Sequence, residues 1–344
     1  MTKVQTRLAI TLAACACLAG AAQAQDVSLP AYQPQHVARP ASAPYLLPDG
    51  SIYIVGDDAL DEVMAKLDAL FAKTHPGFKF TTLMKGSSTA IGGLTAGVSA
   101  LGPMGRVGWP DDVAAFKETF GYEPTDIHIG YDSFTHPGHK NPPALYVNAA
   151  NPLAGLSVED AARLFTSGTP KGDLTHWDQL GLGGKWNKRV IHLYGLRDDG
   201  GFATSIRETM MGKHPFSPRY ETFERPQDVI AAVSQDPYGV ALMGFFNAEE
   251  APGVKLVPLA YGGGGGFAAP SYDAVKAGRY PFASYLRIYV NRRPGSRLDP
   301  FVREYLRMVL SREGQAIIAA GRDSEQGFVP LELPALRAEL AKLD

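Results

Sequence analysis

Short apolar runs alternate with helically spaced apolar positions along most of the chain. Residues 51–55 form a compact apolar run that predicts a strand, and apolar positions from 60 to 71 recur every three or four residues, which predicts a helix. The same order returns with a strand at 79–84 and a helix at 90–98. Because strands that alternate with helices are typical of βαβ units, the pattern predicts an α/β protein with mostly parallel sheets. Further strands are predicted at 127–131, 144–147, 190–194, 238–243 and 285–291, and further helices at 111–120, 157–165, 203–211, 226–234, 299–311 and 313–320.

Residues 1–24 have the pattern of a signal peptide. Lys3 and Arg7 precede an apolar run from 8 to 22, and the small residues around Ala24 are typical of a cleavage site, so we expect cleavage after Ala24. The apolar run is too short to span a bilayer, and no later apolar stretch approaches the ~20 residues that a membrane helix needs.

Both cysteines of the chain lie within the predicted signal peptide. A lipoprotein signal ending at Cys15 is the alternative, and it is less favoured because the apolar segment before Cys15 is short. Cleavage after Ala24 would remove Cys15 and Cys17 and leave a mature protein without thiols or disulfides. An exported protein without disulfides suits the bacterial periplasm. Residues 25–49 contain five prolines and little periodicity, which predicts an extended arm.

Composition excludes disorder and gives no sign of a polyanionic partner. Of 344 residues, 45% are hydrophobic and only 20% are charged, which supplies enough apolar surface for a packed core. The formal net charge is −2, so nothing in the composition indicates nucleic acid or an anionic membrane as the partner. We therefore expect a small-molecule ligand.

Three polar turns fall where parallel strands end and helices begin: 56–59, 86–89 and 197–203. The free amides and the positive dipole end of a helix N-terminus favour anions, so three such turns at one sheet edge favour an anion site. The alternative interpretation is that their Ser, Thr, Asp and Gly residues only cap the helices.

The order of several segments resembles the periplasmic phosphate-binding protein of the ATP-driven phosphate importer. The resemblance implies the type II periplasmic binding-protein fold: two α/β lobes, each a mostly parallel sheet flanked by helices, with a ligand cleft between them. It places lobe one at 50–129 plus 280–344 and lobe two at 130–279, with crossovers near Ile129 and Tyr280. The matching segments are 75–77, 86–89, 151–157, 175–181, 194–195, 280–281, 289–291 and 310–315.

The ligand site departs from the pattern of the family that the chain resembles. Members bind phosphate with a Thr in the first turn, a Ser in the second, an Asp near the end of the first-lobe strands, and an Arg followed by Ser-Gly-Thr in lobe two. Here Ala59 replaces the Thr, Gly105 lacks a hydroxyl beside Arg106, and Leu196 stands at the Arg position, so that only the turn at 86–89 is intact. The candidate ligand-binding residues are Asp57, Asp58, Ala59, Gly86, Ser87, Ser88, Thr89, Gly105, Arg106, Arg197, Asp198, Gly200, Gly201 and Phe202.

These losses predict weak binding of free phosphate, because each missing donor to a buried oxyanion costs about 1.5–3 kcal/mol. The leading hypothesis is a periplasmic solute-binding protein that captures an oxyanion or a phosphate-containing ligand for an ABC importer. The resemblance implies an inner-membrane ABC permease as partner and a monomeric chain. The alternatives are a binding protein for a different ligand, organic with contacts to Phe202 or cationic, and a sensor or adaptor without a transport role.

We expect neither an enzyme nor a metal or cofactor site. The chain has no nucleophile elbow, no phosphate loop ending in Gly-Lys-Ser/Thr and no His-Glu-x-x-His helix. His136 and His139, with Asp132 upstream, are interpreted as a surface loop because Pro and Gly separate the histidines. A cation held by aspartates at 57–58 and 198–199 is the remaining alternative.

Overall fold

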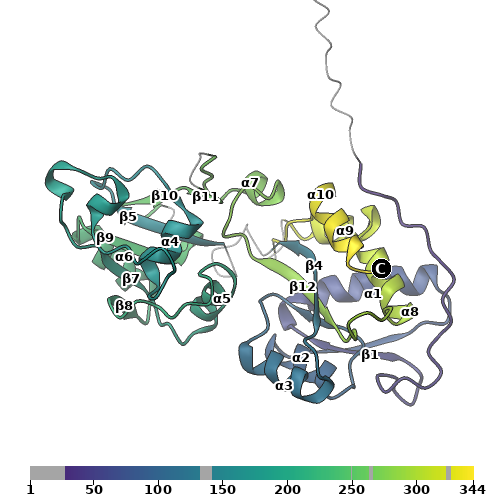
Figure 1. The fold of residues 1–344 in the computed structure, drawn as a ribbon. Helices are drawn as coiled ribbons and strands as arrows, with labels where there is room; N and C mark the ends of the chain where they lie inside the picture. Colours follow the sequence, from purple (N-terminus) through teal and green to yellow (C-terminus); the bar gives the residue numbers. More distant parts are fainter. Residues whose placement is uncertain (1–27, 132–141, 249, 263–265, 323–326) are drawn as a thin grey trace, which may run out of the picture.

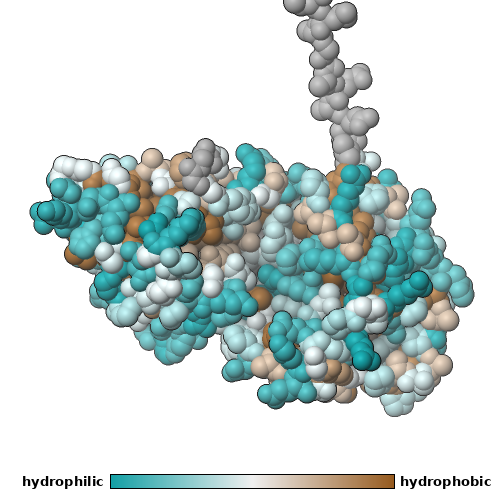
Figure 2. Space-filling view, viewed as in Figure 1, coloured by the Kyte–Doolittle hydropathy of each residue, from teal (hydrophilic) through white to brown (hydrophobic). Residues whose placement is uncertain are grey.

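The computed structural model describes residues 28–131, 142–248, 250–262, 266–322 and 327–344, and it has two α/β lobes that lie side by side (Figure 1). The predicted signal peptide, its two cysteines and the 132–139 segment with its two histidines lie outside the described residues. No described helix combines the length and the apolar character needed to cross a membrane. On the face seen in Figure 2, hydrophilic and neutral residues cover most of both lobes.

The first lobe is built from early and late parts of the chain. Its strands β1 (Ile52–Gly56) and β2 (Phe80–Met84) pair in parallel. In a second sheet, β12 (Tyr285–Val290) lies antiparallel between β3 (Gly102–Met104) and β4 (Thr125–Tyr131). The helices of this lobe are α1 (Asp61–Thr74), α2 (Ser88–Thr95), α3 (Pro110–Phe120), α8 (Pro300–Val309), α9 (Arg312–Ala320) and α10 (Leu333–Ala341).

The second lobe is built around a five-stranded sheet. Its order is β10 (Val254–Val257), β5 (Pro143–Asn148), β9 (Gly239–Gly244), β7 (His192–Leu196) and β8 (Tyr220–Phe223). A short parallel pair joins β6 (Leu156–Ser157) to β11 (Leu259–Ala260). The α-helices of this lobe are α4 (Val158–Phe165), α5 (Gly201–Thr209), α6 (Pro226–Gln235) and α7 (Tyr272–Lys276). It also has 3-10 turns at Trp177–Leu180, Gly184–Trp186 and Phe245–Asn247, and the first lobe has one at Asp58–Leu60 (η1).

The sheets contain more antiparallel pairing than the alternation of strands and helices predicts. In the second lobe β7 pairs in parallel with β8 and β9, whereas β5 pairs antiparallel with both β9 and β10. In the first lobe β12 runs antiparallel to both of its neighbours. The reason is connectivity: β5 and β12 are the first strands after the chain passes from one lobe to the other, so neither follows a βαβ crossover within its sheet.

Each predicted helix and strand has a counterpart whose ends agree within three residues. The elements that the pattern did not predict are β3, β6, β8, β10, β11, α7 and α10. The five strands have only two to four residues, which is too short to show a period. In α10 only Leu336 and Glu339 are buried, although Leu333, Leu336 and Leu340 have helical spacing.

The core of the first lobe contains an aromatic cluster around Phe71 of α1. Phe71 packs edge-on against Phe78 and Phe301 and lies 5.4 Å from the ring of Tyr305, measured between centroids. The Tyr305 hydroxyl donates a 2.6 Å hydrogen bond to Asp68, which is also buried. Burial raises the pKa of Asp68 to about 7, although the Tyr305 hydrogen bond acts in the opposite direction.

The proline-rich arm lies along the first lobe. The Tyr32 hydroxyl donates a 2.8 Å hydrogen bond to the buried Glu304 of α8, and the Gln35 amide donates to the same carboxylate at 2.8 Å. The carbonyl of Pro30 accepts from the Arg312 amide at the start of α9. The arm, which itself has almost no regular structure, is therefore hydrogen-bonded to α8 and to the start of α9.

Candidate functional site

The intact turn at 86–89 lies beside the carboxylate of Asp57. Gly86 has φ = +111°, a conformation that favours glycine and directs the chain from β2 into α2. Ser87 precedes α2 as its N-cap residue, but its hydroxyl makes no capping bond and instead donates to Asp57 Oδ2. Ser88 is exposed, and the Thr89 hydroxyl donates to the Gly86 carbonyl at 2.8 Å.

Asp57 is buried and binds donors from three segments of the first lobe. Its Oδ1 accepts from the Ala59 amide at 3.1 Å, and its Oδ2 accepts from the Gly105 amide at 3.0 Å as well as from the Ser87 hydroxyl. The first of these bonds makes Asp57 the N-cap of η1. Asp57 thus fulfils the predicted capping role, and it also places a negative charge among donors that would otherwise be suited to an oxyanion.

Arg106 lies near the boundary between the two lobes. Its guanidinium lies over the Trp109 ring, 4.2 Å from the centroid, and 3.7 Å from the Asp112 carboxylate. Burial lowers the pKa of Arg106, while Asp112 and Asp57 act against this shift. A Cβ atom placed on Gly201, at the start of α5, would lie 3.9 Å from the Trp109 ring, so the two lobes approach each other here.

The other candidate residues of the second lobe lie in different surroundings. Arg197 is exposed and forms ion pairs with Asp199 at 2.6 Å and Glu224 at 3.3 Å. Gly200 is the N-cap of α5, and Phe202 packs against the hydrophobic core. Asp58 and Asp198 are both exposed. The described residues contain no group of three or more His, Cys, Asp or Glu side chains placed to hold a metal ion.

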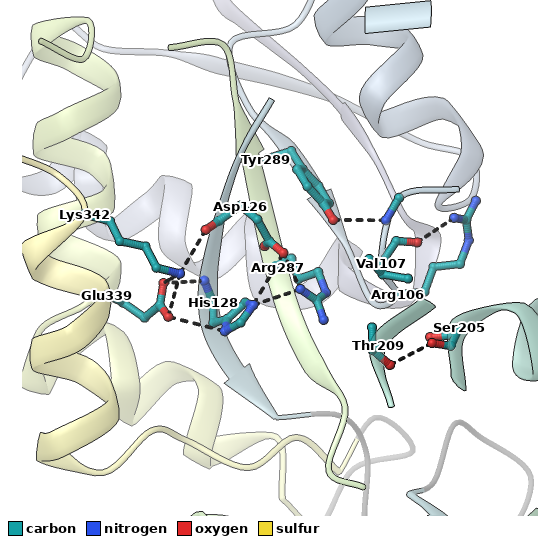
Figure 3. Close-up of polar contacts among 11 residues, drawn as sticks. Arg106, Val107, Asp126, His128, Ser205, Thr209, Arg287, Tyr289, Glu339 and Lys342 are labelled. Carbon is teal, nitrogen blue, oxygen red and sulfur yellow. Dashed lines mark hydrogen bonds and ion pairs between the residues drawn. The ribbon is translucent and has the colours of Figure 1, made fainter. Parts of the chain in front are cut away.

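A pocket of about 410 Å³, here called the interlobe pocket, is lined by both lobes. The first lobe contributes Arg106, Asp126 and His128, and Arg287 lies on the neighbouring strand β12. Helix α5 of the second lobe contributes Ser205 and Thr209, which are four residues apart and so lie on one helix face. Figure 3 shows the arginines on one side and these two α5 residues across from them.

A network of charged side chains supports the first-lobe wall of the interlobe pocket. Asp126 Oδ2 accepts from Arg287 Nη1 and lies 3.4 Å from His128 Nε2, while His128 Nδ1 lies 3.3 Å from Glu339 Oε1 (Figure 3). The His128 ring stacks on Tyr285 with centroids 4.0 Å apart. Burial lowers the pKa of His128, but its hydrogen bonds to Asp126 and Glu339 outweigh this effect, and the pKa is raised overall.

Two polar atoms of the pocket-lining residues have no hydrogen-bond partner among the described residues. They are Nε of Arg287 and Oδ1 of Asp126. Arg287 is only 6% exposed, so its unpaired donor lies in the protein interior. A buried polar atom without a partner is costly, and both of these atoms are shielded from solvent in this arrangement of the lobes.

Three residues of the interlobe pocket are not among those predicted from the sequence: Asp126, His128 and Arg287. A signal for the first two is present, because in β4 the polar residues at 126 and 128 alternate with buried Ile127 and Ile129 and so share one face of the strand. Arg287 gives no comparable signal, since its contact with Asp126 joins positions 161 residues apart.

Comparison with known proteins gives one consistent result. Residues 41–313 match the family model described as PBP superfamily domain. The phosphate-binding protein PstS of Pseudomonas aeruginosa strain PAO1 is 30% identical over 326 residues, which are 94% of this chain and 92% of that protein, and PstS of strain UCBPP-PA14 gives the same values. The crystal structure of PstS from Borrelia burgdorferi is 16% identical, with a TM-score of 0.53 over 81% of this chain and 98% of that one, and it has the same fold.

Proposed function

Because the chain belongs to the phosphate-binding proteins of the PBP superfamily, we propose that it is a periplasmic solute-binding protein that captures an oxyanion or a phosphate-containing ligand between its lobes. The relatives from Pseudomonas aeruginosa are phosphate-binding proteins, and the similarity extends over nearly their whole length. We further propose that it is a monomer that delivers its ligand to an inner-membrane ABC permease.

The observation that carries the proposal is the pair of arginines at the boundary between the lobes. Arg106 and Arg287 both line the interlobe pocket, and a guanidinium is well suited to pair with a phosphate or carboxylate group. Residues of α5 form the opposite wall, so a ligand in this pocket would touch both lobes. A ligand that bridges two lobes favours their closed arrangement, which is how a binding protein can signal occupancy to a partner.

Free inorganic phosphate is expected to bind weakly. Asp57 already engages the Ser87 hydroxyl and the Gly105 amide, and its charge would repel an incoming anion. We expect a dissociation constant for phosphate well above about 1 μM at neutral pH. Isothermal titration calorimetry of the purified mature chain tests this expectation, and a constant at or below about 1 μM would contradict it.

A second measurement separates an anion-binding protein from one that takes cations. Thermal unfolding is followed with millimolar phosphate, with an organic phosphate, and with Mg²⁺ or Ca²⁺ as chloride salts. A ligand that binds only the folded state raises the melting temperature in proportion to its occupancy. The proposal expects stabilisation by phosphate-containing compounds, and stabilisation by the divalent cations alone would contradict it.

A further inference from the structure

The turn at 86–89 already holds an anionic group supplied by the chain itself. Asp57 is 4% exposed and accepts hydrogen bonds from the Ser87 hydroxyl and from the amides of Ala59 and Gly105. Donors of these types, hydroxyl and amide hydrogens converging on one point, are those that would otherwise bind an oxyanion. An incoming phosphate would have to displace a covalently attached carboxylate from these donors. This turn is therefore a poor place for the ligand.

The interlobe pocket, unlike the turn, has two arginine side chains in its lining. Arg287 is 94% buried and lines the pocket. Arg106 lines the same pocket, and its Nη1 donates a 2.9 Å hydrogen bond to the Val107 carbonyl. Arg106 and Arg287 are the two guanidinium groups of the pocket lining, and each lies beside one carboxylate, Asp112 at 3.7 Å from Arg106 and Asp126 beside Arg287.

The size and chemistry of the pocket indicate a ligand larger than inorganic phosphate. A volume of about 410 Å³ lies in the ~300–1,000 Å³ range of pockets for small organic ligands. The Ser205 hydroxyl and the Thr209 hydroxyl, which already donates to the Ser205 carbonyl at 2.7 Å, lie on the second-lobe side, and the partly exposed side chain of Asp126 supplies a carboxylate. A carboxylate in the lining favours a ligand that itself carries O–H groups. Tyr285 also lines the pocket, with its ring stacked on that of His128.

We propose that the interlobe pocket, and not the turn at 86–89, is the ligand site, and that its ligand is a small phosphate ester carrying hydroxyl groups. The phosphate group pairs with Arg287 and Arg106, and a ligand hydroxyl donates to Asp126. Ser205 and Thr209 complete the contact from the second lobe. This proposal rests on the proposed function, because it takes the phosphate-containing ligand from it and adds where and how that ligand binds.

The experiment compares glycerol 3-phosphate with inorganic phosphate by isothermal titration calorimetry on the mature protein. Ser205→Leu fills the pocket from an α5 position that is only partly buried, and Ser234→Leu makes the same change on α6, outside the pocket lining. Arg287→Gln removes the buried charge, and Ser87→Ala removes the hydroxyl at the turn. Far-ultraviolet circular dichroism shows that each variant is folded. Ser205→Leu tests the proposal independently if Arg287→Gln does not fold.

The proposal expects glycerol 3-phosphate to bind more tightly than inorganic phosphate, and Ser205→Leu and Arg287→Gln to weaken it about tenfold or more. Ser234→Leu and Ser87→Ala should leave the dissociation constant within about twofold. If Ser87→Ala weakens binding and Ser205→Leu does not, the turn is the site: the inference is overturned while the proposed function stands. If phosphate binds as tightly as the ester, the ligand class is overturned. If neither compound binds at 10 mM, the proposed function fails together with this inference.

Discussion

The Ser87 hydroxyl donates its hydrogen bond to the carboxylate of Asp57, which lies 30 residues earlier in the chain. Ser87 belongs to the one turn that matches the family pattern, and Asp57 belongs to a turn that departs from it. The two departures of the first lobe, a carboxylate at 57 and Ala59 in place of Thr, thus act at the same point. The turn at 86–89 and the turn at 56–59 are therefore joined by a hydrogen bond, and a change in one affects the other.

Asp57→Ser should therefore strengthen the binding of inorganic phosphate. The substitution removes the internal negative charge and releases the Ser87 hydroxyl and the amides of Ala59 and Gly105, so we expect the dissociation constant to fall about tenfold or more. Calorimetric titration measures it. Asp57→Asn is the matched control, because the charge is lost while the one amide oxygen can still accept from part of the same donors, and it should give a smaller gain. An unchanged or weaker affinity in Asp57→Ser would show that the carboxylate does not block the turn.

Asp68→Asn should stabilise the protein at alkaline pH. The folded-state pKa of Asp68 is raised to about 7 from an ordinary 3.8, so the folded state holds a proton that the unfolded state releases, and stability falls as pH rises between these values. The three-unit difference corresponds to at most roughly 4 kcal/mol above pH 7. Asparagine keeps an oxygen to accept from Tyr305 and has no charge to bury.

Urea unfolding at pH 5 and pH 8 measures this effect. The gain in the free energy of unfolding from Asp68→Asn should be larger at pH 8 by about 1 kcal/mol or more. Asp61→Asn, at an exposed position of the same helix, serves as the control and should show no such difference between the two pH values. An equal gain at both pH values would show that Asp68 is not protonated in the folded protein.

Tyr32→Phe should destabilise the first lobe through the arm. The lost hydroxyl donates to Glu304, which is 3% exposed, and a hydrogen bond to a buried charged group is worth about 1.5–3 kcal/mol. Chemical denaturation followed by circular dichroism gives the change in the free energy of unfolding. Tyr45→Phe is the comparison, because its hydroxyl bonds to Asp299 at an exposed position and should cost less than about 1 kcal/mol. Equal losses in the two variants would contradict a special role for the Tyr32 contact.

The mature protein should begin at Gln25 and be recovered from the periplasm without free thiols. This expectation comes from the sequence alone, since residues 1–27 lie outside the described part of the chain. N-terminal sequencing of the protein from a periplasmic extract gives the first residue directly. Detection of a lipid on Cys15 would replace this prediction with the lipoprotein alternative.

The sequence predicted the elements of the fold better than the contacts of the site. Strand and helix periods are local, so the helix at 61–74 and the strand at 125–131 could be found from their own residues. The β4–β12 pairing places Arg287 beside His128 and joins segments that are distant in the sequence. No local pattern in the sequence predicts this pairing. The lobe boundaries at 129 and 280 stay a prediction, as does the role of each residue in the candidate set.

One limit of local reasoning concerns side-chain direction. Arg197 and Arg106 were equal candidates in the sequence, since each is a basic residue at a turn near a helix. Arg197 turns toward Asp199 and Glu224 on the surface, whereas Arg106 packs on Trp109 and lines the interlobe pocket. Of these neighbours, Asp199 and Trp109 are close in sequence to their arginines, whereas Glu224 lies 27 residues from Arg197.

The position of Trp109 gives the protein an optical signal of its own. Of its three tryptophans, Trp177 and Trp186 are buried in the second lobe, while Trp109 is 38% exposed and lies between Arg106 and Gly201 at the boundary of the lobes. Any change in the spacing of the lobes alters the polarity and the quenching around this one indole and leaves the other two as a constant background. Emission excited at the red edge of tryptophan absorption would then report ligand-driven motion in the unlabelled wild-type chain.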